Sequence, residues 1–389
     1  MNSGIFRFLK QDCVRFGVPA ADALLAEVQQ RQAKRIFVVT GRSLNRRTDA
    51  VTRALAHIQN QVVGLFDECV EHTPRDTVLA LAARLRESRA DLIISIGGGT
   101  VIDTVKVALV ALAENLTELD DMNAWHQRMN PDGSRFVPAP RMPPCRQIAV
   151  PTTLSGAEFS DLGGCTDTRF GTKHGYTGDY IGAAAVILDP QITVHTPDRL
   201  WLSTGIRAVD HAVEALCSVN AQPLIDATSV RALALLSRSL KVYAQDPQNL
   251  AARLDAQLGS WLAATSIRRA EYGASHGMGH ALGADAQVPH GITSCVLLPA
   301  VMRFNASVCA KQLGEVASAM GQPDKPAADQ VEELISSLGL PTRLSHLGLD
   351  KSRLAVIAEK AMANPWVHTN PRKIDNAGVL LEILESAWA

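Results

Sequence analysis

The sequence predicts two domains, an N-terminal α/β domain built on a doubly wound parallel sheet and a C-terminal domain made only of helices. The chain has 389 residues, whereas single hydrophobic cores rarely grow past about 250–300 residues. Short apolar runs alternate with helical periodicity over the first half, and helical periodicity dominates after about residue 197. We therefore expect an α/β domain over residues 1–192 and a helical domain over residues 193–389, with the boundary near 190–196.

The first half supplies the strands of the expected sheet. Strands separated by helices pair in parallel through right-handed crossovers. The expected strands cover residues 35–40, 61–66, 91–96, 147–150 and 183–188, and the expected helices cover residues 48–60, 75–88 and 100–114.

The second half supplies the helical domain, and a cleft between two domains is the default place for a small-molecule site. The expected long helices cover residues 200–220, 223–245, 250–271 and 292–304. One segment of the first half, residues 115–145, is rich in Pro, Gly, Met and Asn and has little periodicity. It predicts a long surface loop or insertion, which is functional, mobile or simply irregular.

The bulk composition indicates a soluble globular enzyme of the cytoplasm. Apolar residues make up 47% and charged residues 20%, and the net charge of −1 argues against a nucleic-acid partner. The N-terminus lacks the pattern of a signal peptide, and the best membrane-span candidate, residues 92–112, is broken by Asp103 and Lys106. The seven cysteines include no CxxC pair, which is typical of reduced thiols in a cytosolic protein.

A glycine triplet stands between the strand at 91–96 and the helix at 100–114. Glycine lets the backbone approach a pyrophosphate closely, and the helix N-terminus offers unpaired N–H groups and a partial positive charge. Gly97, Gly98, Gly99 and Thr100 are therefore candidates for binding a dinucleotide phosphate. The motif is neither GxGxxG nor a Walker loop, and a tight strand-to-helix turn is the alternative interpretation.

The turn after the first expected strand adjoins this loop, because the ends of neighbouring strands line the nucleotide site of a doubly wound sheet. An acidic residue there would bind the ribose 2′-hydroxyl, and this turn contains none. Gly41 leaves room, while Arg42 and Ser43 offer a cation and a hydroxyl to a 2′-phosphate. The turn favours NADP(H), or use of both cofactors, with a solvated surface turn as the alternative.

Histidines cluster in the helical half. His276 and His280 are four residues apart and share a helix face, His290 follows them, and His211 stands four residues after Arg207. Neutral imidazoles suit divalent transition metals, and histidine is also the commonest proton donor near neutral pH. The pattern predicts an active site, with purely structural histidines as the alternative.

These motifs resemble, in order and over most of the chain, those of the iron-type (group III) alcohol dehydrogenase family, and are closest to its maleylacetate reductase branch. The matching pieces are GGGTVIDTVK at 97–106, PTTLSGAE at 151–158, Lys173, LDP at 188–190, GIRAVDHAVEA at 205–215 and HGMGHALGADAQVPHG at 276–291. The resemblance implies an NAD(P)-dependent oxidoreductase with a dehydroquinate synthase-like fold. It also implies an active site between the dinucleotide domain and the helical domain, and a homodimer.

The resemblance assigns roles residue by residue. It implies three metal ligands, His211, His276 and His290, and a non-ligand His280 beside the nicotinamide and the substrate. Together with the two turns, it implies a cofactor-binding set of Gly41, Arg42, Ser43, Gly97, Gly98, Gly99, Thr100, Asp103, Thr152, Thr153, Ser155 and Lys173.

One position departs from the family pattern. Metal-binding members place an Asp ligand four residues before the first histidine ligand, and this chain has Arg207 there. A guanidinium cannot ligate a metal and repels a dication. Asp210 is expected to point about 100° round the helix from the needed direction. PTTLSGAE, and GRSLN at 41–45, are also closer to the metal-independent maleylacetate reductases than to the alcohol dehydrogenases.

We therefore expect a metal-independent NAD(P)H-dependent reductase of a small oxo-carboxylate of the maleylacetate type. The candidate catalytic residues are Arg207, His211, His276 and His280. Arg207 would bind or polarise an anionic oxygen, and His280 or else His276 would donate the proton. The alternatives are an Fe- or Zn-dependent alcohol dehydrogenase with an unconventional fourth ligand, a lyase related to dehydroquinate synthase, and a non-catalytic nucleotide-binding protein.

Overall fold

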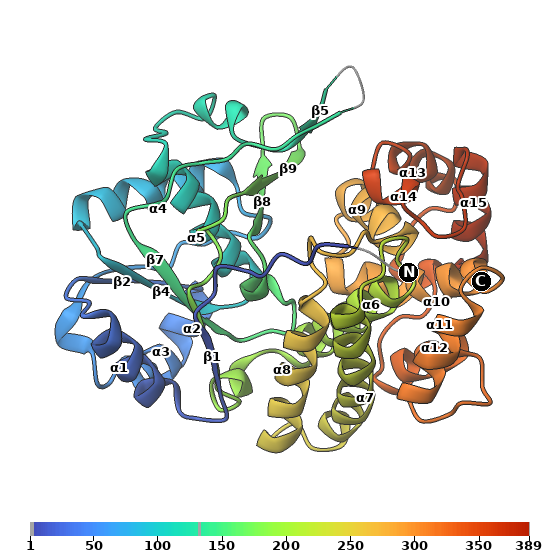
Figure 1. Cartoon of the computed structure of the whole chain (residues 1–389), viewed down its shortest axis with the longest axis horizontal. Helices are drawn as coiled ribbons and strands as arrows, with labels where there is room; N and C mark the ends of the chain where they lie inside the picture. The colour runs from blue at the N-terminus through green and yellow to red at the C-terminus, as the bar shows by residue number, and fades with distance from the viewer. Residues whose placement is uncertain (1–3, 131–133, 389) are drawn as a thin grey trace. The chain divides into compact units, whose positions relative to one another are not determined.

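The computed structural model describes residues 4–130 and 134–388, which form two compact units (Figure 1). One unit spans Phe8–Thr196 and contains every strand of the described chain. The other spans residues 197–388, together with residues 4–7, and its regular elements are all helices. The predicted fold class, an α/β domain followed by an all-helical domain, is confirmed.

The α/β unit is built on a six-stranded sheet in which every neighbouring pair is parallel. The strand order is β1-β10-β7-β4-β2-β3. The strands are β1 Cys13–Phe16, β2 Ile36–Thr40, β3 Val62–Phe66, β4 Leu92–Gly97, β7 Arg146–Pro151 and β10 Ala185–Leu188. All five predicted strands are present, and β1 adds an edge strand that the sequence pattern did not indicate.

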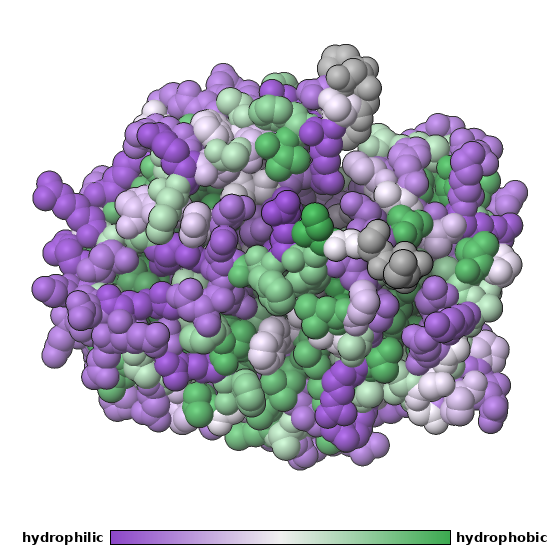
Figure 2. Space-filling model, viewed as in Figure 1, coloured by the Kyte–Doolittle hydropathy of each residue, from purple (hydrophilic) through white to green (hydrophobic). Residues whose placement is uncertain are grey.

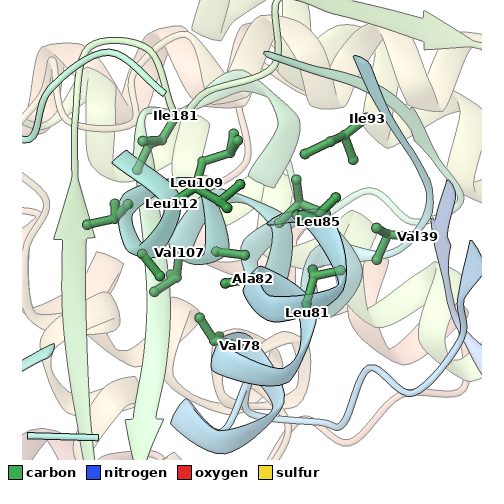
Figure 3. Packing of buried hydrophobic residues seen from close by; sticks show 14 of the residues in the cluster. Val39, Val78, Leu81, Ala82, Leu85, Ile93, Val107, Leu109, Leu112 and Ile181 are labelled. Carbon is green, nitrogen blue, oxygen red and sulfur yellow. The ribbon is translucent and has the colours of Figure 1, made fainter. Parts of the chain in front are cut away.

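Both faces of this sheet are buried. Successive side chains of a strand point to opposite faces, and Phe37, Val39 and Ile93 belong to one buried cluster, whereas Val38 and Ile94 belong to another. The first cluster is completed by α4 (Arg75–Ser88) and α5 (Gly99–Ala113), whose apolar side chains Figure 3 shows packed together. The second is completed by α1 (Ala20–Arg31) and α3 (Ala50–Ala54). The continuous apolar runs of β2 and β4 follow from this double coverage.

The helix expected over residues 48–60 is wrong as a single element. The structure has α3 and the 3₁₀ turn η1 (Gln59–Gln61) in its place, and a separate short helix, α2 (Arg42–Arg47), precedes them. Thr48 is extended between α2 and α3, its hydroxyl donates to the Leu44 carbonyl at 2.5 Å, and it accepts from the Ala50 N–H at 3.3 Å. A side chain that bonds nearby backbone groups in this way competes with continued helix.

The segment expected as a long surface loop, residues 115–145, is anchored at several points. It contains η2 (Asp121–Ala124) and a short antiparallel pair, β5 (Arg128–Met129) with β6 (Arg135–Phe136). Arg75 of α4 donates to the Leu119 carbonyl at 3.1 Å and to Asn123 Oδ1 at 2.7 Å. The Gln127 N–H donates to the Gly175 carbonyl of a second hairpin, β8 (Leu162–Asp167) with β9 (Thr172–Thr177). These bonds tie the described parts of the segment to the α/β unit.

The helical unit is organised around α6 (Asp198–Leu216), in which every residue from Trp201 to Leu216 is buried. It contacts α7 (Pro223–Gln245), α8 (Leu250–Ala264) and α10 (His290–Asn305). The remaining elements are α9 Ala274–Ala286, α11 Ala310–Ala319, α12 Ala327–Ser337, η5 Leu344–Leu347, α13 Arg353–Ala361, α14 Pro365–His368 and α15 Ala377–Ser386. Polar side chains on a buried helix require hydrogen-bond partners. The buried polar residues of α6 include Arg207, Asp210, His211 and Glu214.

Within the described residues, no helix is both long enough and apolar enough to span a bilayer. The most apolar stretch, α5, is only 15 residues long and is buried in the core of the α/β unit. Hydrophilic residues cover much of the surface of that unit in the view of Figure 2. Core packing therefore accounts for the apolar run at residues 92–112.

Candidate active site and cofactor-binding turn

The glycine triplet forms the turn between β4 and α5. Gly98 is the N-cap residue, with φ −81° and ψ −171°, and α5 begins at Gly99. A Cβ on Gly98 would lie 2.9 Å from Thr153 Cγ2, and a Cβ on Gly99 would lie 3.0 Å from Ser155 Oγ. The PTTLSGAE segment thus packs directly on the turn, and the absence of side chains at both glycines permits it.

Other members of the predicted cofactor set meet at the same place. The Thr152 N–H donates to the Gly97 carbonyl at 3.0 Å, and Thr100 occupies the first turn of α5. Asp103 Oδ2 accepts from the Gly164 N–H at 3.1 Å. A Cβ on Gly164 would lie 3.1 Å from Lys173 Nζ, so Lys173 lies beside Asp103 at this turn. The structure therefore brings together the predicted residues of the triplet, the PTTLSGAE segment and β9 at the N-terminus of α5.

Lys106 lies outside the predicted cofactor set and has a structural part in this assembly. It is fully buried, and its ammonium donates to Asp103 Oδ1 at 3.1 Å, Ser160 Oγ at 3.0 Å and the Leu162 carbonyl at 2.7 Å. Three acceptors satisfy the three donors of a lysine. Lys106 therefore fixes α5 against β8 and the segment that precedes it.

The turn at residues 41–43 is the start of a short helix. Gly41 caps α2, and Arg42 and Ser43 are exposed on its first turn. Asp67, just beyond β3, accepts from Arg46 Nε at 2.7 Å and from Asn45 Nδ2 at 3.0 Å, and these bonds lower the pKa of Asp67 to about 2. An acidic residue, Asp67, therefore does lie near the turn, but it follows the next strand. Its oxygens already accept hydrogen bonds from Arg46 and Asn45 of α2.

Arg207 lies in the buried centre of the helical unit with 8% of its surface exposed. Its Nη1 donates to Ser294 Oγ of α10 at 3.0 Å and contacts Asp210 Oδ2 at 3.4 Å. Asp210 Oδ2 also accepts from Ser294 at 2.6 Å and from Ser275 at 2.9 Å. Burial lowers the pKa of Arg207 and raises that of Asp210, and the attraction between the two opposite charges opposes both shifts. The expectation that Asp210 points away from this face is wrong, because residues three apart on a helix are neighbours.

Glu214 is a site residue that the sequence interpretation missed. Its carboxylate accepts from the backbone N–H groups of Gly273 at 3.0 Å and Ser275 at 2.9 Å, at the start of α9. It also lies 2.7 Å from His276 Nδ1. Burial, followed by the neighbouring Asp210, raises the pKa of Glu214 to about 8, so the Glu214–His276 pair holds a proton at neutral pH. The signal was present in the sequence, since polar residues 207, 210, 211 and 214 share one face of an otherwise apolar helix.

The histidines form a stacked aromatic group with Tyr272. The ring of Tyr272 lies 4.1 Å from that of His276 and 5.4 Å from that of His211, centroid to centroid. Burial lowers the pKa values of His211 and His276 well below the ordinary range, so both rings are neutral near pH 7. In the described part of the chain, His211 Nδ1 and His276 Nε2 are buried without a hydrogen-bond partner.

His280 and His290 adjoin the same group through Trp366 of α14. The His280 ring centroid lies 5.0 Å from Trp366 and 5.5 Å from His290. Asn364 Nδ2 lies 3.2 Å from His280 Nδ1. The structure therefore brings together the catalytic candidates Arg207, His211, His276 and His280, and adds Glu214 and Trp366 to their surroundings.

These side chains do not fit the divalent metal that metal-binding members of the family hold, in agreement with Arg207 at the position of the Asp ligand. Zinc ligands lie about 2.0–2.2 Å from the ion, so their ligand atoms must lie close to one another. Among the described residues, one set of possible ligands meets this condition, Asp210, Glu214 and His276, and it is not the predicted set of three histidines. Within that group the contact of 2.7 Å between Glu214 and His276 is a hydrogen bond, and Arg207 lies 3.4 Å from Asp210. The adjacent guanidinium repels a dication. The arrangement is instead suited to holding protons and an anionic oxygen.

Comparison with known proteins covers nearly the whole chain. Residues 12–190 match the family described as iron-containing alcohol dehydrogenase, and residues 201–388 match its C-terminal counterpart, the Fe-containing alcohol dehydrogenase family, C-terminal. The chain is 33% identical over 417 residues to dehydrogenase FUM7 of Gibberella moniliformis, with 96% of this chain and 95% of that protein covered. It is 30% identical over 375 residues to maleylacetate reductase 1 of Rhodococcus opacus, with coverage of 96% and 94%.

The fold is also shared with a solved structure that holds a nicotinamide cofactor. Sulfoacetaldehyde reductase from Bifidobacterium kashiwanohense, in complex with NAD⁺, is similar at a TM-score of 0.85 and 22% identity, with 99% of each chain covered.

Proposed function

The chain belongs to the iron-containing alcohol dehydrogenase family of NAD(P)-dependent oxidoreductases, and from this premise we propose that it is a metal-independent reductase of a small oxo-carboxylate of the maleylacetate type. The observation that carries the proposal is the position of Arg207. Metal-binding relatives have an Asp ligand there, and this chain has a buried guanidinium held by Ser294 and Asp210. A fixed cation in a buried site binds and polarises an anionic oxygen.

The chemistry divides between the cofactor and the helical unit. When bound, NAD(P)H would supply a hydride from C4 of its nicotinamide. Arg207 stabilises the substrate oxygen that gains negative charge as the hydride arrives. His280 supplies one proton, so that a hydride and a proton together reduce one double bond. Neutral His211 and His276 line the site without adding positive charge.

The cofactor binds at the turn before α5. The N-terminus of α5 would hold the pyrophosphate, and Gly98 and Gly99 would let the backbone approach it. At the neighbouring turn, Asp67 is neutralised by Arg46, which leaves the exposed Arg42 to attract a 2′-phosphate. We therefore propose that the enzyme accepts NADPH as well as NADH.

A metal-dependent alcohol dehydrogenase is the second candidate. It is favoured by the buried, unpartnered nitrogens His211 Nδ1 and His276 Nε2, which are found among the described residues. An unpartnered imidazole nitrogen is a potential ligand atom, but the guanidinium of Arg207 opposes occupation by a dication.

The test is a substrate comparison on the purified chain. Oxidation of NADH and NADPH is followed with maleylacetate, with a matched enone that lacks carboxylates, and with simple aldehydes. We expect turnover of maleylacetate and a loss of at least about 100-fold in kcat/KM for the uncharged enone, since a charged partner contributes about 2–4 kcal/mol. Equal activity on aldehydes and on maleylacetate would reject the oxo-carboxylate assignment.

A further inference from the structure

Asn364 connects the start of α14 to His280 of α9. Asn364 is the N-cap residue of α14, and its Oδ1 accepts the Trp366 N–H at 3.1 Å. Its Nδ2 lies 3.2 Å from His280 Nδ1. Residue 365 at the first helical position is proline, which has no N–H. The Trp366 N–H is therefore the group that the cap side chain must satisfy.

This cap fixes which way round the amide lies. The oxygen of an asparagine accepts hydrogen bonds and its nitrogen donates them. Because the backbone N–H of Trp366 can only donate, Oδ1 must face it, and Nδ2 must face His280. An Nδ2 donor requires a lone pair on His280 Nδ1, so a neutral His280 carries its proton on Nε2.

From this geometry we infer that Asn364 is a positioning residue, which sets the tautomer of His280 so that Nε2 holds the proton delivered to the substrate. The inference rests on the proposed function, in which His280 is the proton donor. Asn364 also orders Trp366, whose ring lies 5.0 Å from the His280 ring. One side chain therefore controls both the hydrogen-bonding state and the packing of His280.

The other candidate donor on the same helix, His276, has a different kind of partner. His276 Nδ1 lies 2.7 Å from Glu214 Oε2, which also accepts from the backbone N–H of Gly273 at 3.0 Å. The Nδ1 side of His276 is thus engaged in a hydrogen bond with a carboxyl group that itself binds a proton at neutral pH. The partner of His280 can only donate, so a neutral His280 presents an Nε2–H group whatever the protonation state of Glu214.

The test replaces the hydrogen-bond donor that faces His280 by an acceptor, while residue 364 still caps α14. Asn364→Asp retains a strong N-cap residue, but its carboxylate can only accept, so it draws a proton onto His280 Nδ1. Asn364→Ser also caps the helix, and its shorter side chain no longer donates to His280. The matched control is Asn376→Asp, because Asn376 caps α15 through Gly378 and Val379 in the same way.

The first readout is the tautomer of His280 in the enzyme without substrate, measured from ring ¹⁵N shifts of histidine-labelled protein and assigned with His280→Gln. We expect an unprotonated Nδ1 in the wild type and in Asn376→Asp, and a protonated Nδ1 in Asn364→Asp. The second readout is steady-state kinetics at about pH 9, about 2.5 units above the ordinary histidine pKa. We expect kcat of Asn364→Asp to fall about 100-fold or more, the scale of general-acid catalysis, with KM changed less than about threefold.

The outcomes distinguish the positioning role of Asn364 from the role of His280 as proton donor. A wild-type His280 protonated on Nδ1, or an unprotonated Nδ1 in Asn364→Asp, would overturn the positioning role. A changed tautomer with unchanged kcat would support the positioning role and remove His280 as the proton donor of the proposed function. Melting curves that match between Asn364→Asp and Asn376→Asp confirm that the folded enzyme is being compared.

Discussion

Replacement of Arg207 by alanine should abolish most of the activity while leaving a folded protein. Among the described residues, the guanidinium of Arg207 donates to Ser294 and Asp210, and it uses Nη1 for both hydrogen bonds. The donors on Nη2 and Nε therefore remain for a substrate oxygen. Loss of one fixed donor to a charged transition state costs about 2.7–4 kcal/mol, so kcat/KM of Arg207→Ala should fall about 10²–10³-fold.

The same change also affects stability, and this effect must be separated from catalysis. Removing one partner of a buried ion pair costs about 3–5 kcal/mol when the other charge is left unpaired. Here Asp210 retains the hydroxyl donors Ser275 and Ser294, and its raised pKa eases its protonation, so we expect about 2–3 kcal/mol. Arg207→Ala/Asp210→Asn removes the unpaired charge and should recover part of that loss.

The assay is NAD(P)H oxidation with maleylacetate, paired with urea unfolding of each variant. The account predicts that Arg207→Ala and the double variant lose activity alike, although the double variant is the more stable of the two. Arg207→Lys should keep part of the activity, because a lysine retains the charge without the planar fork. A folded Arg207→Ala with kcat/KM within about threefold of wild type would refute the role of Arg207.

Three further predictions concern the cofactor turn and the buried carboxyl group. Gly98→Ala should weaken NADH binding about 10–100-fold in a fluorescence titration, because its Cβ would lie 2.9 Å from Thr153 Cγ2. The control is Gly314→Ala, whose Cβ would have nothing within 4 Å; it should bind NADH normally and gain up to about 1 kcal/mol of stability. Equal NADH binding by the two variants would contradict the close packing at Gly98. Arg42→Ala should raise KM for NADPH about tenfold and change KM for NADH less than about twofold, and equal effects on the two cofactors would reject contact with a 2′-phosphate. The pKa of Glu214 is raised from 4.5 to about 8, so the folded state binds this proton more tightly than the unfolded chain. Its stabilisation is complete below the unfolded pKa and is lost as pH rises through about 8. Denaturant midpoints should therefore fall more between pH 5 and about 9 in the wild type than in Glu214→Gln, and parallel pH profiles would exclude this titration.

The parts of the fold that the sequence predicted are those with strong local signals. Buried parallel strands are continuous apolar runs, and β4 followed by a glycine triplet marks both the sheet and the cofactor turn. The edge strand β1 and its helix α1 lack such a signal, since β1 is the short sequence CVRF and is only partly buried. The break between α2 and α3 depends on one hydroxyl, that of Thr48, which periodicity cannot reveal.

The sequence likewise predicted some residues of the candidate site and missed others. Arg207 and the histidines are visible in the sequence because motif order and helix spacing identify them. The partners of those residues come from distant segments: Glu214 meets backbone N–H groups about 60 residues later, and Asn364 meets His280 across 84 residues. The homodimer and the cytoplasmic location stay predictions.

The most direct test of the central claim is the metal content of the active enzyme. Protein purified without added metal and treated with chelator would be analysed for iron and zinc, and the same sample assayed with NADPH and maleylacetate. The account predicts far less than one metal per chain and full reductase activity. About one iron or zinc per chain, with activity lost to chelator and restored by that metal, would contradict it and would mean that His211 and His276 ligate a metal despite Arg207.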